Sequence, residues 1–409
     1  MSELKKELDW LYNLERFGSK LELDRIEKIM ELFGNPHNNL KFIHIAGTNG
    51  KGSTASMVSS VLIEAGYKTG LYTSPHLLGF NERIQINGKE ITDEEAVSLI
   101  KEIRKLMEEN NLQLTFFEFV TVIAFLYFYK QSTEYVVVEV GLGGRYDATN
   151  IITPVIAAIT NIDLDHTHIL GNSKLEIVKE KAGIVKKGNP LVSGVSEVDE
   201  DVNEYLRELC SSLGCELIQT DKKIEDYVQN NFTIGLIGKH QIKNASVALL
   251  ILRKLGIDDK YIHAGLEKVK WPGRIDIRSW HGNRVIMDSA HNSAGMQCFV
   301  DYLRNHVSDD KTIIIGFSKD KNITEMIEIL KSVLSDKDRI YVTKSDFKPA
   351  DVSDVRDIAK EILGNSITIE MFENSTDAVD KALEYNKDII ITGSIYLLGK
   401  ILQQEKHFL

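Results

Sequence analysis

The chain has 409 residues, which is more than one ordinary hydrophobic core holds, so its length favours two domains. Its 43% hydrophobic and 27% charged residues are typical of a soluble globular enzyme or binding protein. The formal net charge of -11 argues against a nonspecific nucleic-acid binder, which would carry a basic excess. An acidic protein that handles phosphates must therefore concentrate its cations locally.

The cysteines and the apolar runs indicate the compartment. The three cysteines, Cys210, Cys215 and Cys298, have neither the spacing of a redox pair nor that of a zinc site, which favours a reducing, cytoplasmic setting. The charged N-terminus has no signal-peptide core. The most apolar run, residues 116–129, is too short to span a bilayer and contains Glu118, so we expect a buried helix there.

Residues 1–40 are predicted to be helical, because apolar side chains recur near the helical period up to the stop at Gly34-Asn35-Pro36. Phe42 to Ala46 then form an apolar strand, and a glycine-rich turn from Gly47 to Gly52 follows it. Beyond the turn, apolar residues recur again at helical spacing. This succession is the phosphate-cradling unit of nucleotide-binding α/β proteins. Its glycines let backbone N–H groups surround an anion, and the helix N-terminus adds its positive end.

The glycine-rich loop departs from the standard G-x-x-x-x-G-K-[ST] pattern, because Ile45 and Gly52 stand where that pattern needs Gly and Ser or Thr. Lys51 would still reach the β- and γ-phosphates of a nucleotide, and Ser53 or Thr54 would offer a hydroxyl to Mg²⁺. The alternative is an ordinary glycine-rich turn between a strand and a helix. We favour a nucleotide phosphate site.

Further along, residues 69–72 form a short predicted strand that ends in a turn with Ser74. Ligands of open α/β sheets gather at such strand ends, so Ser74 is a candidate metal or phosphate ligand, with a plain Ser-Pro turn as the alternative. Residues 82–86 alternate like a strand. Thr92 and Glu95 form a capping box that opens the next helix.

Residues 135–140 form a nearly continuous apolar run, typical of a strand buried on both faces of a parallel sheet. Its one carboxylate, Glu139, is costly to bury unless it is paired or bound to a metal, so we expect it to hold Mg²⁺ beside the phosphate loop. The segment 141–147 is not a dinucleotide fingerprint, because Tyr146 stands at the last glycine position. The aromatic cluster at residues 115–119 favours core packing over a ligand platform.

A polar segment with His166 follows the predicted strand at residues 155–160, and a functional role or an ordinary capping or surface role is open for this histidine. In the helix after it, Lys181 lies on the same stripe as Ile177 and Ile184. That spacing makes Lys181 point inward. The alternative is a surface lysine that snorkels to water.

Residues 195–235 are polar and poorly periodic, and their pattern says little. A strongly apolar helix follows, through Leu255, and Trp271-Pro272-Gly273-Arg274 breaks the pattern. We therefore predict one domain over 1–271 and a second over 272–409. In the second domain, strand-like runs alternate with helix-like segments, as in an α/β domain with a largely parallel sheet, and the runs lie at residues 285–287, 312–315, 339–342, 367–371 and 389–392.

Seven motifs occur in the order found in folylpolyglutamate synthases: G-T-N-G-K-G-S, S-P-H-L, E-V-G-L-G-G-R-Y-D-A-T-N, D-H-T-H-I-L-G, E-K-A-G-I, P-G-R and D-S-A-H-N. The chain therefore resembles this family, whose relatives are the bifunctional dihydrofolate synthases and, more distantly, the Mur ligases. The resemblance extends from about Leu23 to Gly399. It implies an α/β fold with an N-terminal P-loop ATPase domain, a smaller C-terminal Rossmann-like domain, and ATP and substrates bound between them.

The resemblance also implies roles for single residues. ATP would be held by Thr48, Asn49, Gly50, Lys51, Gly52, Ser53, Asn244, Arg274 and Asp288. Mg²⁺, expected at two sites, would be held by Ser74, Glu139 and His166. The pterin or folate would lie near Phe116, Phe117, Glu118, Tyr146, Asp147 and Ala148, and the incoming glutamate near His291, Ser394 and Arg83. Catalytic roles fall to Lys51, Lys181, His166 and His291, and Lys181 would be carboxylated by CO₂, which turns a cation into an anion that organises the metal site.

The implied activity is an ATP-dependent ligase that adds L-glutamate to folate, to dihydropteroate, or to both, through an acyl phosphate. The expected partners are these small molecules, with no nucleic acid and no membrane, and the expected state is a monomer. The family usually reads D-G-A-H-N-P, but Ser289 and Ser293 stand here in place of Gly and Pro. This departure keeps a ligase for another carboxylate open. A non-catalytic ATP switch is the alternative from a different class.

Overall fold

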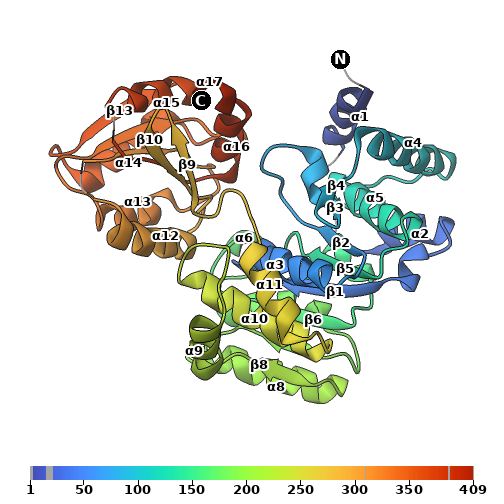
Figure 1. The fold of residues 1–409 in the computed structure, drawn as a ribbon. Coiled ribbons are helices and arrows are strands. Elements are labelled where there is room, and N and C mark those ends of the chain that lie inside the picture. The colour runs from blue at the N-terminus through green and yellow to red at the C-terminus, as the bar shows by residue number, and fades with distance from the viewer. Residues whose placement is uncertain (1–2, 15–21, 309, 386, 409) are drawn as a thin grey trace. The chain divides into compact units, whose positions relative to one another are not determined.

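The computed structural model describes residues 3–14, 22–308, 310–385 and 387–408 (Figure 1). Within it the chain forms two compact units. Unit 1 comprises Met1–Gly235 and Gln241–Val269, and unit 2 comprises Leu236–His240 and Lys270–Leu409. The domain limits 1–271 and 272–409 remain our prediction. No helix in the described ranges is both long and apolar enough to cross a membrane.

Unit 1 is built on an eight-stranded sheet in the order β4-β3-β2-β5-β1-β6-β7-β8. The strands from β2 to β8 in this order pair in parallel, and β3 and β4 add an antiparallel hairpin at one edge. Strand β1 lies between β5 and β6, which come much later in the chain. The bounds are β1 Lys41–Ala46, β2 Thr69–Tyr72, β3 Ile84–Ile86, β4 Lys89–Glu90, β5 Tyr135–Glu139, β6 Ile156–Ile159, β7 Leu191–Ser193 and β8 Leu217–Gln219.

Most strand predictions for unit 1 are confirmed, namely those over residues 42–46, 69–72, 135–140 and 155–160. The strand predicted over 82–86 is a correction, because it begins only at Ile84 and follows a short 3₁₀ helix, Phe80–Arg83. The Glu82 carboxylate causes the difference. It accepts the backbone N–H groups of residues 77–79 at 2.6 to 2.8 Å, which curls the chain before the strand can start.

The segment 195–235, whose pattern said little, contains two helices and a strand of three residues. Helix α8 (Glu200–Leu213) buries Val202, Leu206 and Cys210 along one stripe. Strand β8 is too short to show the alternation that identifies strands in a sequence. The structure is therefore regular where the sequence is uninformative.

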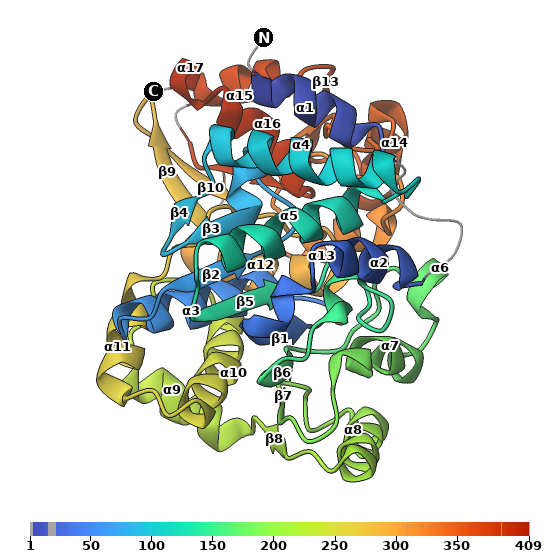
Figure 2. The same cartoon turned by 90° about the vertical axis from the view of Figure 1, so that its right-hand side faces the viewer.

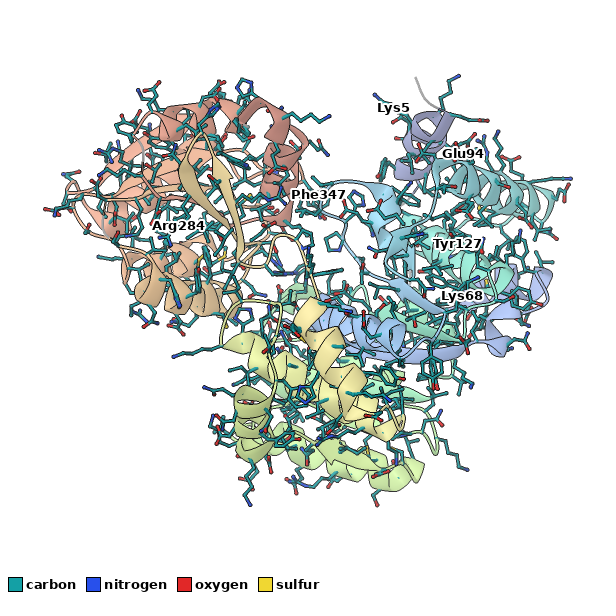
Figure 3. All side chains as sticks on the ribbon, viewed as in Figure 1. Lys5, Lys68, Glu94, Tyr127, Arg284 and Phe347 are labelled. Carbon is teal, nitrogen blue, oxygen red and sulfur yellow. The ribbon has the colours of Figure 1, made fainter. Side chains whose placement is uncertain are left out.

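Helix α5 (Phe116–Lys130) forms the core of the N-terminal part of unit 1, as predicted for this apolar run. Its N-terminus is a capping box in which the Thr115 N–H donates to Glu118 at 2.6 Å. The helix packs on one face of the sheet against residues that include Phe42 and Val138. Tyr127, labelled in Figure 3, donates its hydroxyl hydrogen to Glu95 of α4 at 3.1 Å. Figure 2 shows α1, α4 and α5 as successive layers over β5.

The other helices of unit 1 surround the sheet. Helix α3, which follows the glycine-rich loop, packs against β1, β2, β5 and α11. In the predicted helical region 1–40 the described residues form α1, α2 and a 3₁₀ turn, and residues 1–2 and 15–21 lie outside them. The bounds are α1 Glu3–Tyr12, α2 Asp24–Leu32, α3 Lys51–Glu64, α4 Asp93–Glu109, α6 Thr167–Leu170, α7 Lys174–Lys181, α9 Lys222–Asn231, α10 His240–Lys254 and α11 Asp259–Lys268.

Unit 2 has a six-stranded sheet in the order β13-β12-β11-β14-β10-β9. The five strands from β13 to β10 are parallel, as the alternating pattern predicted. Strand β9, which the sequence did not reveal, adds an antiparallel edge next to β10. The bounds are β9 Asp276–Trp280, β10 Asn283–Met287, β11 Thr312–Ile315, β12 Arg339–Thr343, β13 Thr368–Phe372 and β14 Ile389–Thr392.

Helices cover both faces of this sheet. Helices α12 and α13 lie on one side, and α15 and α16 lie on the other (Figure 1). Core side chains of unit 2 come from α12, α13 and α14 together with β11 and β12. The helix bounds are α12 Ser293–His306, α13 Ile323–Lys331, α14 Val352–Leu363, α15 Ser375–Leu383, α16 Ile395–Gln403 and α17 Glu405–Phe408.

A buried ion pair fixes the start of β11 against β12. Lys311 Nζ lies 2.8 Å from Asp338 Oδ2, and the side chains are 2% and 0% exposed. The Asp338 carboxylate also accepts the backbone N–H groups of Lys311 and Ser335. A buried carboxylate with this many donors is satisfied, but either partner alone would be an uncompensated charge.

We expect Asp338→Ala to lower the free energy of unfolding by about 3–5 kcal/mol, because it leaves the Lys311 amine buried without its partner. The measurement is urea unfolding. Asp310→Ala is the matched control. Asp310 pairs with Arg339 and Lys387 at a more exposed position, so its removal should cost much less than the removal of Asp338. Equal losses for the two variants would contradict this account.

Candidate functional site

Three loops of unit 1 meet at the carboxyl edge of the sheet. The glycine-rich loop follows β1, Glu139 ends β5, and Asn161 follows β6. Because β5 and β6 flank β1 in parallel, these three strand ends are neighbours. This is the edge at which open α/β sheets bind ligands.

The loop after β1 has a shape that requires glycine at two positions. Gly47 has a φ of 150° and Gly50 a φ of 80°. A Cβ at Gly47 would lie 1.9 Å from Thr160 Oγ1, and a Cβ at Gly50 would lie 2.2 Å from Asn244 Oδ1. Gly50 is also the residue before α3, so the loop delivers the chain into a helix N-terminus. Such a turn suits the binding of a phosphate anion.

The loop is tied to the residues that follow β6. Asn161 Oδ1 accepts the Asn49 N–H at 2.9 Å, and Thr160 Oγ1 donates to the Asn49 carbonyl at 2.6 Å. The Thr48 hydroxyl donates to the Asp163 carbonyl and accepts the Asp163 N–H, both at 3.0 Å. Thr48 and Asn49 therefore first hold the loop in shape. The tethering residues Thr160 and Asn161 were missed, although their place at the end of a predicted strand was a usable signal.

Helix α3 carries the first cation of the site. Lys51 Nζ donates to the carbonyls of Gly47 and Thr48 at 3.1 and 3.0 Å, so the amine lies against the loop. Gly52 and Ser53 continue the first turn of α3, where Ser53 is buried. The first turn of the helix and the Lys51 amine together present positive charge at the loop.

Lys181, at the end of α7, supplies the second cation. Its side chain is 5% exposed, so the inward orientation predicted from the stripe is confirmed. Lys181 Nζ donates to the Gly47 carbonyl at 2.8 Å. Burial, and then the charge of nearby Lys51, lower the pKa of Lys181 from 10.5 to about 7. A substantial share of this amine is therefore neutral at physiological pH.

Two of the three predicted metal ligands lie together. The buried Glu139 carboxylate accepts the Ser74 N–H at 3.1 Å through Oε2. His166 has a left-handed φ of 50°, and its Nε2 lies 3.8 Å from Asp165 Oδ1. Carboxylate and hydroxyl oxygens are among the ligands that Mg²⁺ prefers, so the types of these two side chains suit a metal site. Among the described residues no group of three or more His, Cys, Asp or Glu side chains could hold a metal ion, so the ligand set stays a prediction.

The aromatic residues at the start of α5 pack against other rings of unit 1. Phe117 stacks on Tyr72 with ring centroids 6.2 Å apart, and a Cβ at Gly141 would collide with its ring. Phe116 stacks on Tyr12 at 5.4 Å. Core packing, the favoured alternative, thus describes Phe117 well.

Glu118 has a structural role that the sequence reasoning did not assign. Its carboxylate closes the capping box of α5 and forms an ion pair with Arg25 at 3.1 Å. Its assignment to the substrate stays a prediction.

Arg83 is buried and is held from two sides. Its Nε donates to His76 Nδ1 at 2.8 Å, and its guanidinium lies 5.5 Å from the ring centroid of Phe116. Burial and then Arg83 lower the pKa of His76 to about 3, so His76 is neutral and can accept. His76 was not singled out, although it stands in the S-P-H-L motif.

The segment from Tyr146 to Ala148, predicted to lie near the substrate, contains both exposed and buried residues. Tyr146 is 46% exposed, while Ala148 is buried. The Asp147 carboxylate is buried and accepts the N–H groups of Leu142 and Thr149 at 2.9 and 3.0 Å. Asp147 therefore shapes its own loop, which the substrate assignment did not foresee.

In unit 1, Asn244 lies against Gly50 and donates to Gln241 Oε1 at 2.9 Å. The neighbouring Gln241 was missed, although it precedes Asn244 by one helical turn, at a spacing that places both on one face. This pair links α10 to the glycine-rich loop.

In unit 2, the residues after β10 form a second polar strand end. Asp288 is buried and accepts the N–H groups of Ile275 and Ala290, both at 2.9 Å. Burial raises the pKa of Asp288 to about 6, against an opposing effect of the Arg274 charge. His291 Nδ1 lies 2.9 Å from the Ser289 carbonyl.

Ser394, after β14, is buried and caps α16 by accepting the Tyr396 N–H at 3.2 Å. Because β14 pairs with β10, Ser394 and His291 follow two neighbouring parallel strands. The departure from D-G-A-H-N-P is accommodated locally. Asn292 caps α12, which begins directly at Ser293.

Comparisons with known proteins agree with this architecture. The sequence model of the Mur ligase middle domain matches residues 45–252, and that of the dihydrofolate synthetase C-terminal domain matches residues 274–404. The chain is 33% identical to the dihydrofolate synthase/folylpolyglutamate synthase of Bacillus subtilis, covering 97% of this chain and 98% of that protein. It is 34% identical to the dihydrofolate synthetase of Saccharomyces cerevisiae, covering 94% and 97%.

Solved structures give the same result. E. coli FolC in complex with DHPP and ADP has a TM-score of 0.86 at 28% identity, over 99% of this chain and 98% of that one. A bifunctional folylpolyglutamate synthase/dihydrofolate synthase with Mn, AMPPNP and L-glutamate bound matches with the same score, identity and coverage. Fold and sequence thus define an α/β protein of the Mur ligase class. Within that class, the chain belongs to the folylpolyglutamate synthase and dihydrofolate synthase family.

We expect Gly50→Ala to weaken ADP binding by about tenfold, which is about 1.4 kcal/mol. The added methyl group must displace Asn244 from the loop. Gly66→Ala is the matched control, since Gly66 also has a positive φ, of 89°, but no atom within 4 Å of the added Cβ. Calorimetric titration with ADP measures both. If Gly50→Ala binds ADP as tightly as Gly66→Ala and the wild type, the contact between Gly50 and Asn244 is not needed for nucleotide binding.

The lowered pKa of Lys181 predicts that the stability of the folded protein depends on pH. Its folded pKa of about 7 lies below the ordinary 10.5, so between these values the unfolded chain binds more protons and stability rises with pH. Lys181→Met removes the cost of burying the charge, and Lys51 still donates to the Gly47 carbonyl. We therefore expect the melting temperature of this variant, relative to that of the wild type, to be higher at pH 6 than at pH 9.5. Thermal unfolding in CO₂-free buffer measures this difference, and a difference independent of pH would contradict the assignment.

Proposed function

We propose that this protein is an ATP-dependent ligase that joins L-glutamate to the carboxylate of folate and of dihydropteroate. The observation that carries the proposal is the meeting of the glycine-rich loop, the Lys51 and Lys181 amines and the Ser74–Glu139 pair at one sheet edge. This edge offers a place for ATP phosphates with a metal ion beside them. The L-glutamate and DHPP in the related structures support the substrate class.

The chemistry requires activation of the acceptor. A carboxylate is a poor acyl donor, because its leaving group would be oxide. Phosphorylation by ATP gives an acyl phosphate, and the amine of glutamate then displaces phosphate to form the amide, with ADP and phosphate as products. In phosphoryl transfer the protein contributes mainly positioning and electrostatic stabilisation.

The loop and α3 perform the positioning in unit 1. Backbone N–H groups of residues 48–53 hold the phosphates, and Lys51 turns from the loop carbonyls toward the transferred phosphoryl group. When bound, Mg²⁺ neutralises phosphate charge, and we propose that it occupies two sites served by Ser74, Glu139 and His166. The packed Asn244 keeps Gly50 and the helix N-terminus in place.

Lys181 is proposed to be carboxylated. A neutral amine can add CO₂ and lose one proton, and the lowered pKa of Lys181 makes the neutral form available. The product is an anion, which removes the repulsion between Lys181 and Lys51. It also adds oxygen atoms at the edge that holds Glu139.

The second unit is proposed to serve the nucleotide and glutamate through Arg274, Asp288, His291 and Ser394. The attacking amine must be neutral, so a base or an orienting group is required. His291 has its Nδ1 engaged with the Ser289 carbonyl, which fixes the ring and favours an orienting role. We further propose that the protein acts on small molecules as a monomer.

The test is ADP formation with Mg·ATP and L-glutamate, with dihydropteroate, a reduced monoglutamyl folate or no acceptor, and with products identified by mass. We expect ADP and a new amide with each acceptor, and neither without acceptor or glutamate. Turnover with one acceptor alone would restrict the activity to that acceptor. ADP formation that depends on neither the acceptor nor L-glutamate would contradict the ligase proposal and favour an ATP switch.

We expect Lys51→Met to lower kcat/KM by about 100-fold or more, because it removes the cation that stabilises the moving phosphoryl group. Lys89→Met serves as the control, since Lys89 is an exposed lysine on β4 at the sheet edge. Its activity should match the wild type. A Lys51→Met enzyme with wild-type kcat/KM would remove this residue from the mechanism.

A further inference from the structure

A histidine is buried in the centre of the sheet of unit 1, and the proposed function does not use it. His44 lies in the middle of β1, is 0% exposed, and comes three residues before the glycine-rich loop. Its Nε2 lies 2.8 Å from Thr149 Oγ1. Burying an imidazole costs free energy unless its nitrogens form hydrogen bonds, so the contact with Thr149 offsets part of this cost.

The direction of the hydrogen bonds follows from Thr149. Its hydroxyl donates to Asp147 Oδ1, an oxygen that also accepts the Thr149 N–H. The Thr149 oxygen must therefore accept from His44, which places a hydrogen on Nε2. Nδ1 is buried with no hydrogen-bond partner, and burial lowers the pKa of His44 to about 3. His44 is thus a neutral imidazole with one fixed tautomer.

The hydrogen bonds that start at His44 end at Asp147, whose carboxylate joins the two ends of the loop 142–149. Besides the Thr149 hydroxyl, Asp147 accepts the N–H groups of Leu142 and Thr149. These two residues bracket the segment 142–149. The Asp147 carboxylate thus joins the two ends of this segment, and His44 bonds to the Thr149 side chain that contacts the carboxylate.

The same segment is clamped to the end of α7. The Arg145 N–H donates to the Glu180 carbonyl at 2.8 Å, and Asn150 Nδ2 donates to the carbonyls of Arg145 and Gly183 at 2.9 and 3.1 Å. A Cβ at Gly144 would lie 2.6 Å from the Lys181 carbonyl. The position of the backbone on either side of Lys181 therefore depends on the position of the segment 142–149.

We propose that His44 is a positioning residue that, through Thr149 and Asp147, holds the Tyr146–Ala148 segment and the end of α7 in their working geometry. Its effect on turnover rests on the proposed function, because it acts where the pterin or folate acceptor and Lys181 are assigned. Its effect on the geometry of the segment 142–149 does not rest on the proposed function. The glycine-rich loop keeps its own tethers to Thr160 and Asn161, so nucleotide binding is largely independent of His44.

The tautomer supplies a matched pair of variants. The amide nitrogen of Gln reaches about as far from the backbone as imidazole Nε2, whereas that of Asn reaches only as far as Nδ1. His44→Gln should therefore keep the donor to Thr149, and His44→Asn should lose it. Thr149→Ser and Thr149→Val form a second pair, which keeps and removes the hydroxyl. Thr312→Val is the control, since Thr312 has a buried hydroxyl without a hydrogen-bond partner on β11 of unit 2.

Two readouts decide the proposal. We expect His44→Asn and Thr149→Val to raise the KM for the acceptor by about tenfold, on the scale of one lost buried hydrogen bond, and to leave ADP affinity within about twofold. The same variants should speed hydrogen exchange of the Leu142 and Thr149 amides. His44→Gln, Thr149→Ser and Thr312→Val should stay near the wild type in both readouts.

The outcomes separate the two proposals. If the wild type forms no acceptor-dependent ADP, the proposed function fails, and hydrogen exchange alone decides the role of His44. Unchanged exchange and acceptor KM in His44→Asn and Thr149→Val, with only a lower melting temperature, would overturn the positioning role. So would a His44→Gln enzyme as impaired as His44→Asn, because the fixed Nε2–H donor would then be irrelevant.

Discussion

The site of unit 1 depends on one carbonyl group, that of Gly47, which accepts hydrogen bonds from the amines of both Lys51 and Lys181. Burial, and after it the charge of Lys51, lowers the pKa of Lys181, so two protonated amines at this one carbonyl are disfavoured. An incoming phosphate or a carboxylated Lys181 would relieve the repulsion between them. The loop is therefore built to be incomplete without negative charge, in a protein whose net charge is -11.

In both units, many of the polar side chains assigned to ligands also hold the backbone. Thr48, Glu118, Asp147 and Asp288 were assigned to ligands from the family motifs, yet each one accepts backbone N–H groups of its own neighbourhood. The assignments and these contacts are compatible, because a side chain can both shape a loop and face a ligand. They indicate that the geometry is preorganised, which is the main source of electrostatic catalysis.

The sequence predicted the fold well where burial leaves a strong pattern. The runs that became β1, β5 and α5 are buried on several sides, so they are nearly continuous apolar runs in the sequence. The helical spacing of Lys181 with Ile177 and Ile184 likewise predicted that Lys181 points inward. The sequence failed to predict the fold where elements are short or where one side chain overrides the pattern. β8 and β9 carry too few inward residues to be recognised, and Glu82 converted the start of a predicted strand into a 3₁₀ turn.

The candidate site divides in the same way. The motifs predicted which loops matter, because glycine, lysine and a buried carboxylate at strand ends have direct chemical meanings. They did not predict the tethers Thr160 and Asn161, or the partner His76, because hydrogen bonds between distant segments leave no periodic trace. Only the packing of the chain reveals that these residues support the ones the motifs name.

The edge strands of the unit 1 sheet have a consequence for association between copies. An exposed strand edge offers unpaired N–H and C=O groups, which can pair with the edge of another molecule and lead to aggregation. Here the edges are β4, with only Lys89 and Glu90, and β8, with three residues. Edges so short, and on one side charged and exposed, give a second chain almost no template. The long, apolar, aggregation-prone strands β1 and β5 are thereby kept in the middle of the sheet.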